Sequence, residues 1–139
     1  MIEKLRGYPL ILKKVRRLRQ LNSHPVFRWD LHKQMWGILA ETGWNNKSEA
    51  LWRMGIEEEP RSKCFACEAE SALDENVGFC LFCVCPLDWG FCTGEPCVTG
   101  LYGMWLEADS SEERKCIAAL IRDLPLAPYA RDLYEVIDD

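Results

Sequence analysis

Seven of the eight cysteines in this 139-residue chain lie in one stretch, and this cluster constrains the fold more than any other feature. The stretch reads KCFACEAESALDENVGFCLFCVCPLDWGFCTGEPC and covers residues 63–97. It contains two C-x2-C pairs, Cys64 with Cys67 and Cys80 with Cys83. In such a pair one tight turn directs two sulfurs at a common point, and two turns together can enclose a tetrahedral Zn²⁺. The spacing therefore predicts one zinc ion held by these four cysteines.

Cys85 makes the ligand set ambiguous, because the second pair reads C-L-F-C-V-C-P and offers three thiols for two positions. C-x2-C spacing favours Cys83, with Cys85 as the alternative ligand. Cys92 and Cys97 have no assigned role. A two-metal cluster, which needs about six thiolates, is the alternative to one zinc with the spare cysteines packed as small hydrophobes. Cys116 is expected in the core.

Other uses of the cysteines fit the sequence less well. The only early apolar run, YPLIL, precedes its basic cluster, so no secretory signal is expected. We therefore expect a reducing cytoplasm, where clustered cysteines bind metal more often than they form disulfides. A redox C-x-x-C pair would need a βαβ context, and a cysteine nucleophile would need a nearby histidine base. The two histidines, His24 and His32, are distant in sequence, and we predict that the chain is not an enzyme.

The charge is distributed unevenly along the chain, whose net charge is −5. Residues 1–28 contain eight basic residues and one acidic residue, whereas the remainder contains nine basic and 21 acidic residues. Five of the basic residues would face outward from a helix over residues 9–21: Lys13, Lys14, Arg16, Arg17 and Arg19. This face could bind nucleic acid, or it could dock on an acidic protein surface or on the acidic remainder of the chain.

The hydrophobic pattern predicts a mainly α, small helical domain with a four-cysteine zinc-knuckle insert and at most a short β-hairpin. We divide this one domain into a basic N-terminal helix (1–22), a helical segment (23–56), the zinc-knuckle region (57–100) and C-terminal helices (101–139). No apolar run is long enough to cross a membrane.

Local signals place the individual elements. The second helix is expected to begin near Ser23, with Pro25 in its first turn, and to end at Gly43. A capping box of Ser110 and Glu113 should start a later helix that runs to about Asp123. A last short helix after Pro128 should use Leu133, Val136 and Ile137. SALDENVG, at residues 71–78, is expected to be a loop or short hairpin.

The same pattern predicts which side chains are buried. The core is expected to include Phe27, Leu31, Met35 and Leu39 from the second helix, and Ile117, Leu120, Ile121 and Leu124 from the late helix. Trp44 and Trp52 should anchor a short connection, and His32 should be half-buried.

Several pieces of the chain together resemble a group of small cysteine-rich proteins of bacteriophage and prophage genomes. These pieces are HPVFRWDLHKQMWGILAETG, CFACEAE, C-x2-C followed by PLDWG, GLYGMWLEA and IAALIRDLPL, spread over roughly residues 24–126. The resemblance implies a phage origin and zinc binding, but no activity. The chain departs from the group's pattern where Val84 and Cys85 intrude before Pro86, and the basic helix is not part of that pattern.

These features together favour a non-enzymatic, phage-type, zinc-stabilised protein. We expect it to bind and inhibit a host protein in the host cytoplasm, for example a defence effector such as a CRISPR-associated nuclease. The alternative is a nucleic-acid-binding zinc protein that acts through its basic N-terminal helix. The sequence identifies neither the partner nor the oligomeric state.

Overall fold

The computed structural model describes residues 24–60, 63–77, 85–89 and 100–138. The described part of the chain is mainly helical, as the sequence predicted. It also contains a small two-stranded parallel sheet, which was not predicted. The proposed basic helix, and with it Lys13, Lys14, Arg16, Arg17 and Arg19, lies outside the described residues.

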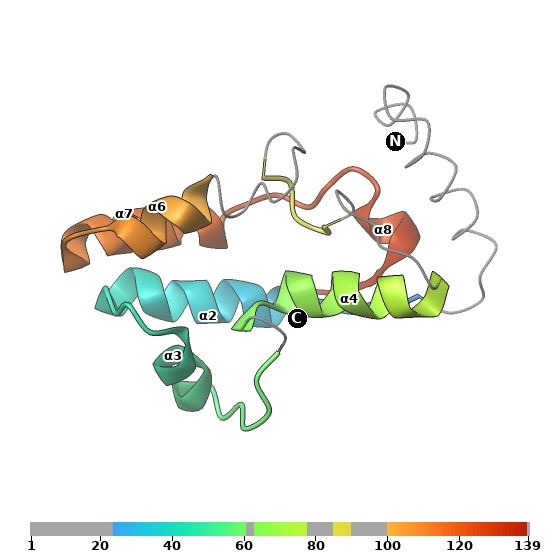
Figure 1. Cartoon of the computed structure of the whole chain (residues 1–139), viewed down its shortest axis with the longest axis horizontal. Coiled ribbons are helices and arrows are strands. Elements are labelled where there is room, and N and C mark those ends of the chain that lie inside the picture. The colour runs from blue at the N-terminus through green and yellow to red at the C-terminus, as the bar shows by residue number, and fades with distance from the viewer. Residues whose placement is uncertain (1–23, 61–62, 78–84, 90–99, 139) are drawn as a thin grey trace.

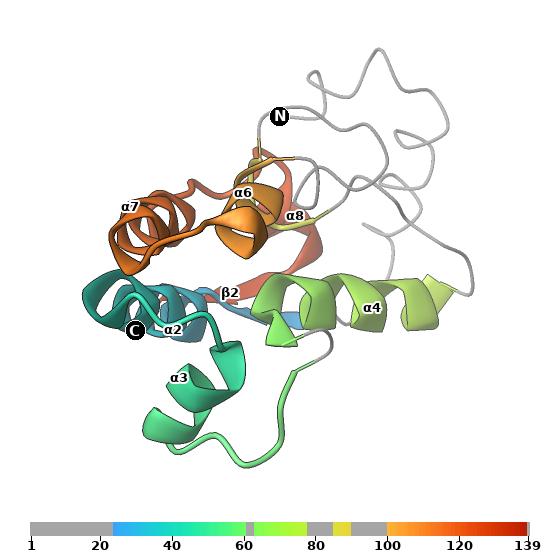
Figure 2. The same cartoon turned by 60° about the vertical axis from the view of Figure 1, so that its left-hand side comes forward.

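Helix α2 (Trp29–Thr42) is the element against which most of the others pack. Helix α7 (Ser111–Arg122) makes the most extensive contact with it, and α6 (Leu101–Glu107) packs beside α7. Helix α3 (Lys47–Arg53) lies on the other side of α2, while α4 (Phe65–Val77) extends beyond its N-terminal end (Figures 1 and 2).

The small sheet joins two segments that are distant in sequence. Strand β1 (Val26–Arg28) pairs in parallel with β2 (Glu135–Ile137), so that Phe27 lies opposite Val136. The second helix therefore begins at Trp29 rather than near Ser23, because residues 26–28 are committed to this pairing. The last helix, α8 (Ala130–Leu133), is correspondingly short, since Val136 and Ile137 belong to β2.

Helix boundaries follow local chemistry at three predicted positions. Gly43 ends α2 in the left-handed conformation, with φ of 72°, and its N–H donates to the carbonyl of Leu39 over 2.9 Å. Ser110 caps α7, because its Oγ accepts the N–H of Glu113 at 3.2 Å. The Glu113 carboxylate in turn accepts the N–H of Asp109 at 3.3 Å. Gly43 and Ser110 are thus confirmed as capping residues, while the Glu113 carboxylate contacts Asp109 rather than the Ser110 N–H that a capping box uses.

The core is continuous from α2 to the helices on either side of it. Trp36 and Trp105 meet edge to face with ring centroids 5.1 Å apart, and Tyr102 stacks on Trp105 at 5.9 Å. Aromatic contacts of this kind add to the stabilisation that comes from burying the rings. The largest fully buried side chains are Phe27, His32, Met35, Leu39, Leu51, Leu73, Ile121 and Leu133.

Four burial predictions were wrong, and one of them concerns Cys116, which is exposed on α7. Leu120 is 56% exposed on α7, and Trp52 is 83% exposed on α3. His32 is fully buried rather than half-buried, because the contact of α2 with α7 covers it. None of the helices in the described ranges combines the length and apolar character needed to cross a membrane.

Candidate metal centre

Cys64 and Cys67 are brought together at the start of α4. Cys64 directly precedes the helix, and its Sγ accepts the backbone N–H of Cys67 at 3.4 Å. Phe65 and Ala66, between the two thiols, are buried and fix this turn against the core. The first C-x2-C pair therefore forms the tight turn that its spacing predicted, with a backbone amide directed at a sulfur.

The surroundings of Cys64 favour its thiolate form. The pKa of Cys64 is lowered to about 6, chiefly by a hydrogen bond from the Cys67 side chain, while burial acts in the opposite direction. The Lys47 ammonium, at the start of α3, lowers this pKa further. The same ammonium lies 4.3 Å from the centroid of the Tyr102 ring. The site thus combines a preferred thiolate with a positive charge, as a metal ligand or a reactive thiol requires.

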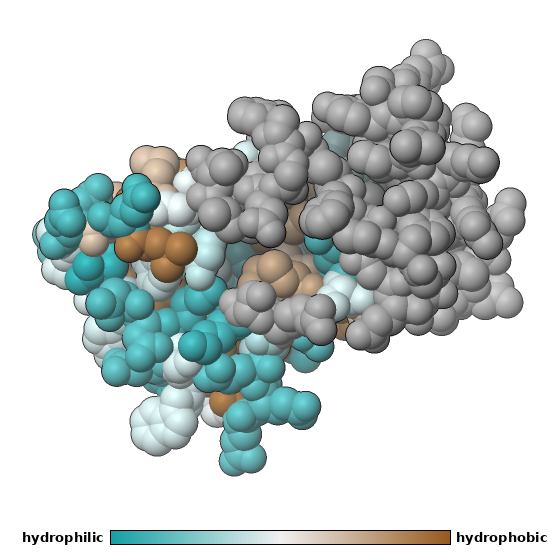
Figure 3. Space-filling model, in the orientation of Figure 1, coloured by the Kyte–Doolittle hydropathy of each residue, from teal (hydrophilic) through white to brown (hydrophobic). Residues whose placement is uncertain are grey.

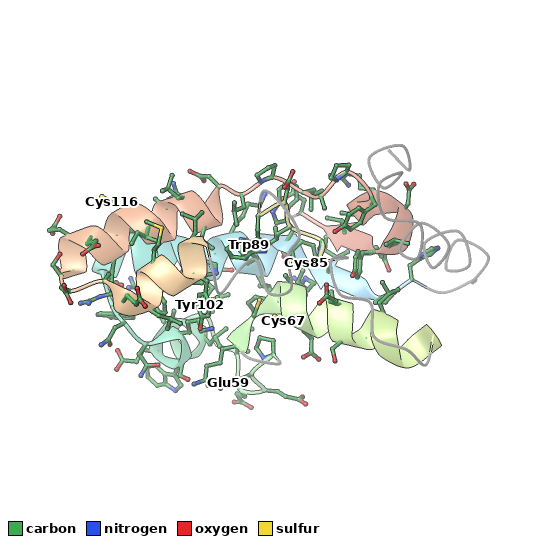
Figure 4. The ribbon with its side chains drawn as sticks, turned by 45° about the horizontal axis from the view of Figure 1, so that its top comes forward. Glu59, Cys67, Cys85, Trp89, Tyr102 and Cys116 are labelled. Atoms are coloured by element: carbon green, nitrogen blue, oxygen red, sulfur yellow. The ribbon has the colours of Figure 1, made fainter. Side chains whose placement is uncertain are left out.

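Cys85 belongs to a segment that is hydrogen-bonded to the C-terminal part of the chain. Its carbonyl accepts the Oη–H of Tyr129 at 3.0 Å. The N–H of Ala127 donates to Pro86 at 2.8 Å, and Leu87 and Leu126 form an isolated antiparallel bridge. Cys85 therefore packs against the same core as Cys64, and Figure 4 shows Cys67 and Cys85 in the same part of the molecule.

The Cys85 thiol lies within electrostatic reach of the first pair. Burial raises its pKa above the ordinary range, and the negative charge of Cys64 raises it further. The Trp89 indole lowers this pKa, so it lies beside the thiol. Among the described residues, Trp89 Nε1 has no hydrogen-bond acceptor at normal distance, although it is buried. A metal-bound thiolate at Cys85 would accept a hydrogen bond from this indole, whereas without a metal the raised pKa keeps the Cys85 thiol protonated.

The remaining predicted ligands are not placed by the structure. Cys80 and Cys83, as well as Cys92 and Cys97, lie outside the described residues. Within the described ranges, no group of three or more His, Cys, Asp or Glu side chains is arranged to hold a metal ion. The structure thus positions Cys64 and Cys67 as a pair, with Cys85 nearby. Cys116 was expected in the core but is exposed on α7, away from this region (Figure 4).

Both histidines are directed at backbone carbonyls. His32 Nε2 lies 3.0 Å from the carbonyl oxygen of Ile121, and His24 Nδ1 lies 3.2 Å from that of Leu133. Each ring therefore uses one nitrogen to join two distant segments of the chain. This is a structural use of histidine, and neither contact involves a cysteine.

Sequence reasoning missed Lys47 and Trp89 as neighbours of the thiols. Trp89 could have been noticed, since it follows Cys85 by four residues in a Pro-containing segment. Lys47 gives no sequence signal, because it approaches Cys64 through the packing of α3. Comparisons with protein-family models, with curated proteins and with solved structures found no match to this chain.

Proposed function

We propose that this chain is a non-enzymatic, zinc-stabilised helical protein whose function is to bind another protein. The observation that supports zinc best is the turn formed by Cys64 and Cys67, in which an amide donates to a sulfur that already favours the thiolate. Cys80 and either Cys83 or Cys85 would complete the ligand set. The bound zinc would supply folding free energy by joining α4 to the segment that contains Cys85.

A structural rather than catalytic role follows from the chemistry of this ligand set. Four thiolates around zinc leave no open position for water or substrate. The two histidines contact the carbonyls of Leu133 and Ile121, and this use favours structural roles over that of a general base beside a cysteine.

Protein binding is supported by the surface of the helical body. Trp52 is 83% exposed, although tryptophan is among the residues that most often dominate the energy of protein interfaces. The resemblance to phage proteins supplies the expected setting, in which the partner is a host protein and the outcome is inhibition of a defence system. This setting rests on analogy with other small phage proteins, and the analogy does not specify the target.

An affinity capture experiment tests the proposed function. The tagged full-length chain would be incubated with lysate of a bacterial host, with and without nuclease, and complexes would be isolated by size-exclusion chromatography. We expect one stoichiometric protein partner that survives nuclease treatment. The Cys64→Ser/Cys67→Ser variant should lose this partner together with its fold, whereas Cys116→Ser, at an exposed position, should retain it.

Two results would contradict the proposal. Loss of every partner on nuclease treatment would favour the nucleic-acid-binding alternative, in which the basic residues between positions 13 and 19 contact phosphates. A complete absence of partners from several hosts would argue against a protein-binding function.

A further inference from the structure

We propose that the outward side of α3, together with the acidic segment that follows it, binds a basic protein surface that contains an apolar pocket for the indole of Trp52. This proposal rests on the proposed function and adds to it the contact surface and the chemistry of the partner. We call this region the Trp52 surface; it consists of Glu49, Trp52, Glu57, Glu58 and Glu59.

Trp52 faces outward because its neighbours in α3 face inward. Ala50 and Leu51 are both 0% exposed and attach the helix to the core. Successive helical residues are rotated by about 100°, so the residue after this buried pair is turned towards solvent. Trp52 thereby forgoes the burial that usually makes a tryptophan stabilising, which is roughly 150–250 Å² of surface. The Trp52 ring is therefore exposed to solvent and contributes little to the stability of the core.

Both ends of α3 are capped by hydrogen bonds that fix the backbone carrying Trp52. At the N-terminus, Asn46 Oδ1 accepts the N–H of Ser48 at 2.9 Å. At the C-terminus, the N–H of Gly55 donates to the carbonyl of Trp52 at 2.9 Å, and that of Ile56 donates to Leu51 at 3.0 Å. This pair of bonds is a Schellman ending, and it makes Trp52 part of a rigid cap. A backbone fixed in this way loses less conformational freedom when the surface binds a partner.

Exposed carboxylates precede and follow Trp52 in the sequence. Glu49 precedes Trp52 by three residues, and therefore lies on a neighbouring side of the helix. Glu57, Glu58 and Glu59 follow the cap directly and are exposed. In the part of the chain that the structure describes, none of these four carboxylates forms an ion pair.

The nearby cations contact aromatic rings of the same body. The Arg53 guanidinium lies 6.0 Å from the centroid of the Trp44 ring, and Lys47 lies over Tyr102. Among the described residues, three cations lie near these four carboxylates in sequence, Lys47, Arg53 and Lys63, so the excess of negative charge lies in the run Glu57, Glu58 and Glu59. Repulsion among the carboxylates is relieved when a surface rich in lysine and arginine approaches, and the same field steers such a partner towards the ring.

The position of α3 suits this role. Figures 1 and 2 show α3 and the segment after it projecting from the side of α2 opposite to α6 and α7. In Figure 3 this lower part of the molecule is largely hydrophilic, and Figure 4 shows Glu59 at the lower edge of the view. A projecting helix with one exposed tryptophan, followed by three exposed glutamates, is suited to a concave basic partner, such as a channel that accommodates nucleic acid.

A peptide-binding measurement tests the proposal on the full-length protein. The probe is a labelled helix-forming peptide of leucine, lysine and arginine, compared with a peptide of leucine and glutamate and with poly-L-lysine. Fluorescence anisotropy at low and physiological salt gives the affinities. We expect the basic amphipathic peptide to bind more tightly than either comparison, and Trp52→Ala to weaken this binding by about 10-fold or more.

Charge variants measure the contribution of the three glutamates separately from that of the Trp52 indole. The triple variant Glu57→Lys/Glu58→Lys/Glu59→Lys should weaken binding by a similar factor and remove most of its salt dependence. Leu106→Ala and Glu107→Lys change an exposed apolar and an exposed acidic residue on α6, and they should leave the affinity unchanged. Circular dichroism should show the wild-type fold in every variant, since all the altered side chains are exposed.

Several outcomes would overturn the proposal. These are no binding of the basic peptide, equal binding of the acidic peptide, or an affinity that survives Trp52→Ala or the triple charge reversal. A dimer that Trp52→Ala dissociates would show that a second copy, not a basic protein, occupies this surface. If a captured host protein binds wild type and Trp52→Ala equally, the proposed function stands and this inference fails; if no protein is captured at all, the proposed function fails.

Discussion

His32 links the two helices that form the centre of the molecule. It is 1% exposed, and its Nε2 lies 3.0 Å from the carbonyl oxygen of Ile121 on α7. Burial lowers the pKa of this imidazole from 6.5 to about 4, and the nearby Lys33 ammonium acts in the same direction. The ring is therefore neutral in the folded protein near neutral pH, with its Nε2–H donating to the carbonyl.

The depressed pKa of His32 predicts a pH dependence of stability. Between pH 6.5 and about 4 the unfolded chain binds a proton at this residue that the folded chain does not bind. The free energy of unfolding should therefore be highest above pH 6.5 and should fall by up to ~3 kcal/mol as the pH falls to about 4.

Urea denaturation of wild type and His32→Gln at several pH values checks this prediction. Glutamine can still donate to the carbonyl of Ile121 but does not titrate. Comparison with this variant also removes the contribution of thiols and carboxylates that titrate in both proteins. Parallel stability curves for the two proteins between pH 7 and 4 would show that His32 contributes nothing to the pH dependence.

At the scale of the elements, the sequence predicted helices best where capping residues mark their ends. Ser110 with Glu113, and Gly43 with its left-handed φ, set the limits of α7 and α2 as expected. Helix α4 was missed, because the cysteines and polar residues of this stretch were interpreted as a loop. Ala66, Ala69 and Leu73 are buried at helical spacing, and this signal could have identified α4.

The small sheet could not be predicted from local sequence. Its two strands have three residues each, and they pair across more than one hundred residues of sequence. Only tertiary packing determines that residues 26–28 form a strand rather than the first turn of a helix. In the metal centre, likewise, the spacing predicted the turn of Cys64 and Cys67, whereas the approach of Lys47 depends on how α3 packs.

The contact between the end of α2 and the start of α7 predicts an unusual sensitivity at Gly43. A Cβ atom at this position would lie 2.8 Å from both the Cβ and the carbonyl oxygen of Ser111, and the φ of 72° disfavours any other L residue. Gly43→Ala should therefore lower the free energy of unfolding by ~3 kcal/mol or more, since strain and steric overlap add.

Gly55 is the matched control for this prediction. It has a φ of 80°, but a Cβ there would meet nothing within 4 Å. Gly55→Ala should cost only the conformational strain, ~1–2 kcal/mol. Thermal or chemical denaturation of both variants gives the comparison. Equal losses of stability would show that the close approach of Ser111 is not a constraint on Gly43.

At the scale of the whole molecule, the described helices form one continuous core, while residues 78–100, which include five of the cysteines, connect α4 to α6. The Cys64–Cys67 turn packs on this core from one side, and the segment of Cys85 packs on it through Tyr129. A zinc ion shared by these two parts would join the start of α4 to the segment of Cys85 and so add folding free energy to this part of the core.

The identity of the fourth ligand is tested by two single substitutions. C-x2-C spacing predicts that Cys83→Ser loses zinc and that Cys85→Ser retains it. Because Cys85 lies near Cys64 and Trp89, it is the main alternative to Cys83 as the fourth zinc ligand. Zinc loss in Cys85→Ser alone would transfer the assignment from Cys83 to Cys85.

The most direct test of the zinc-stabilised fold is the metal content of the full-length protein, purified without added metal and analysed by inductively coupled plasma mass spectrometry. We predict about one equivalent of zinc per chain. Its removal by a chelator should be accompanied by loss of the near-ultraviolet circular dichroism of the aromatic core. Protein that contains no zinc, or contains iron in its place, and is nevertheless fully folded would contradict the account.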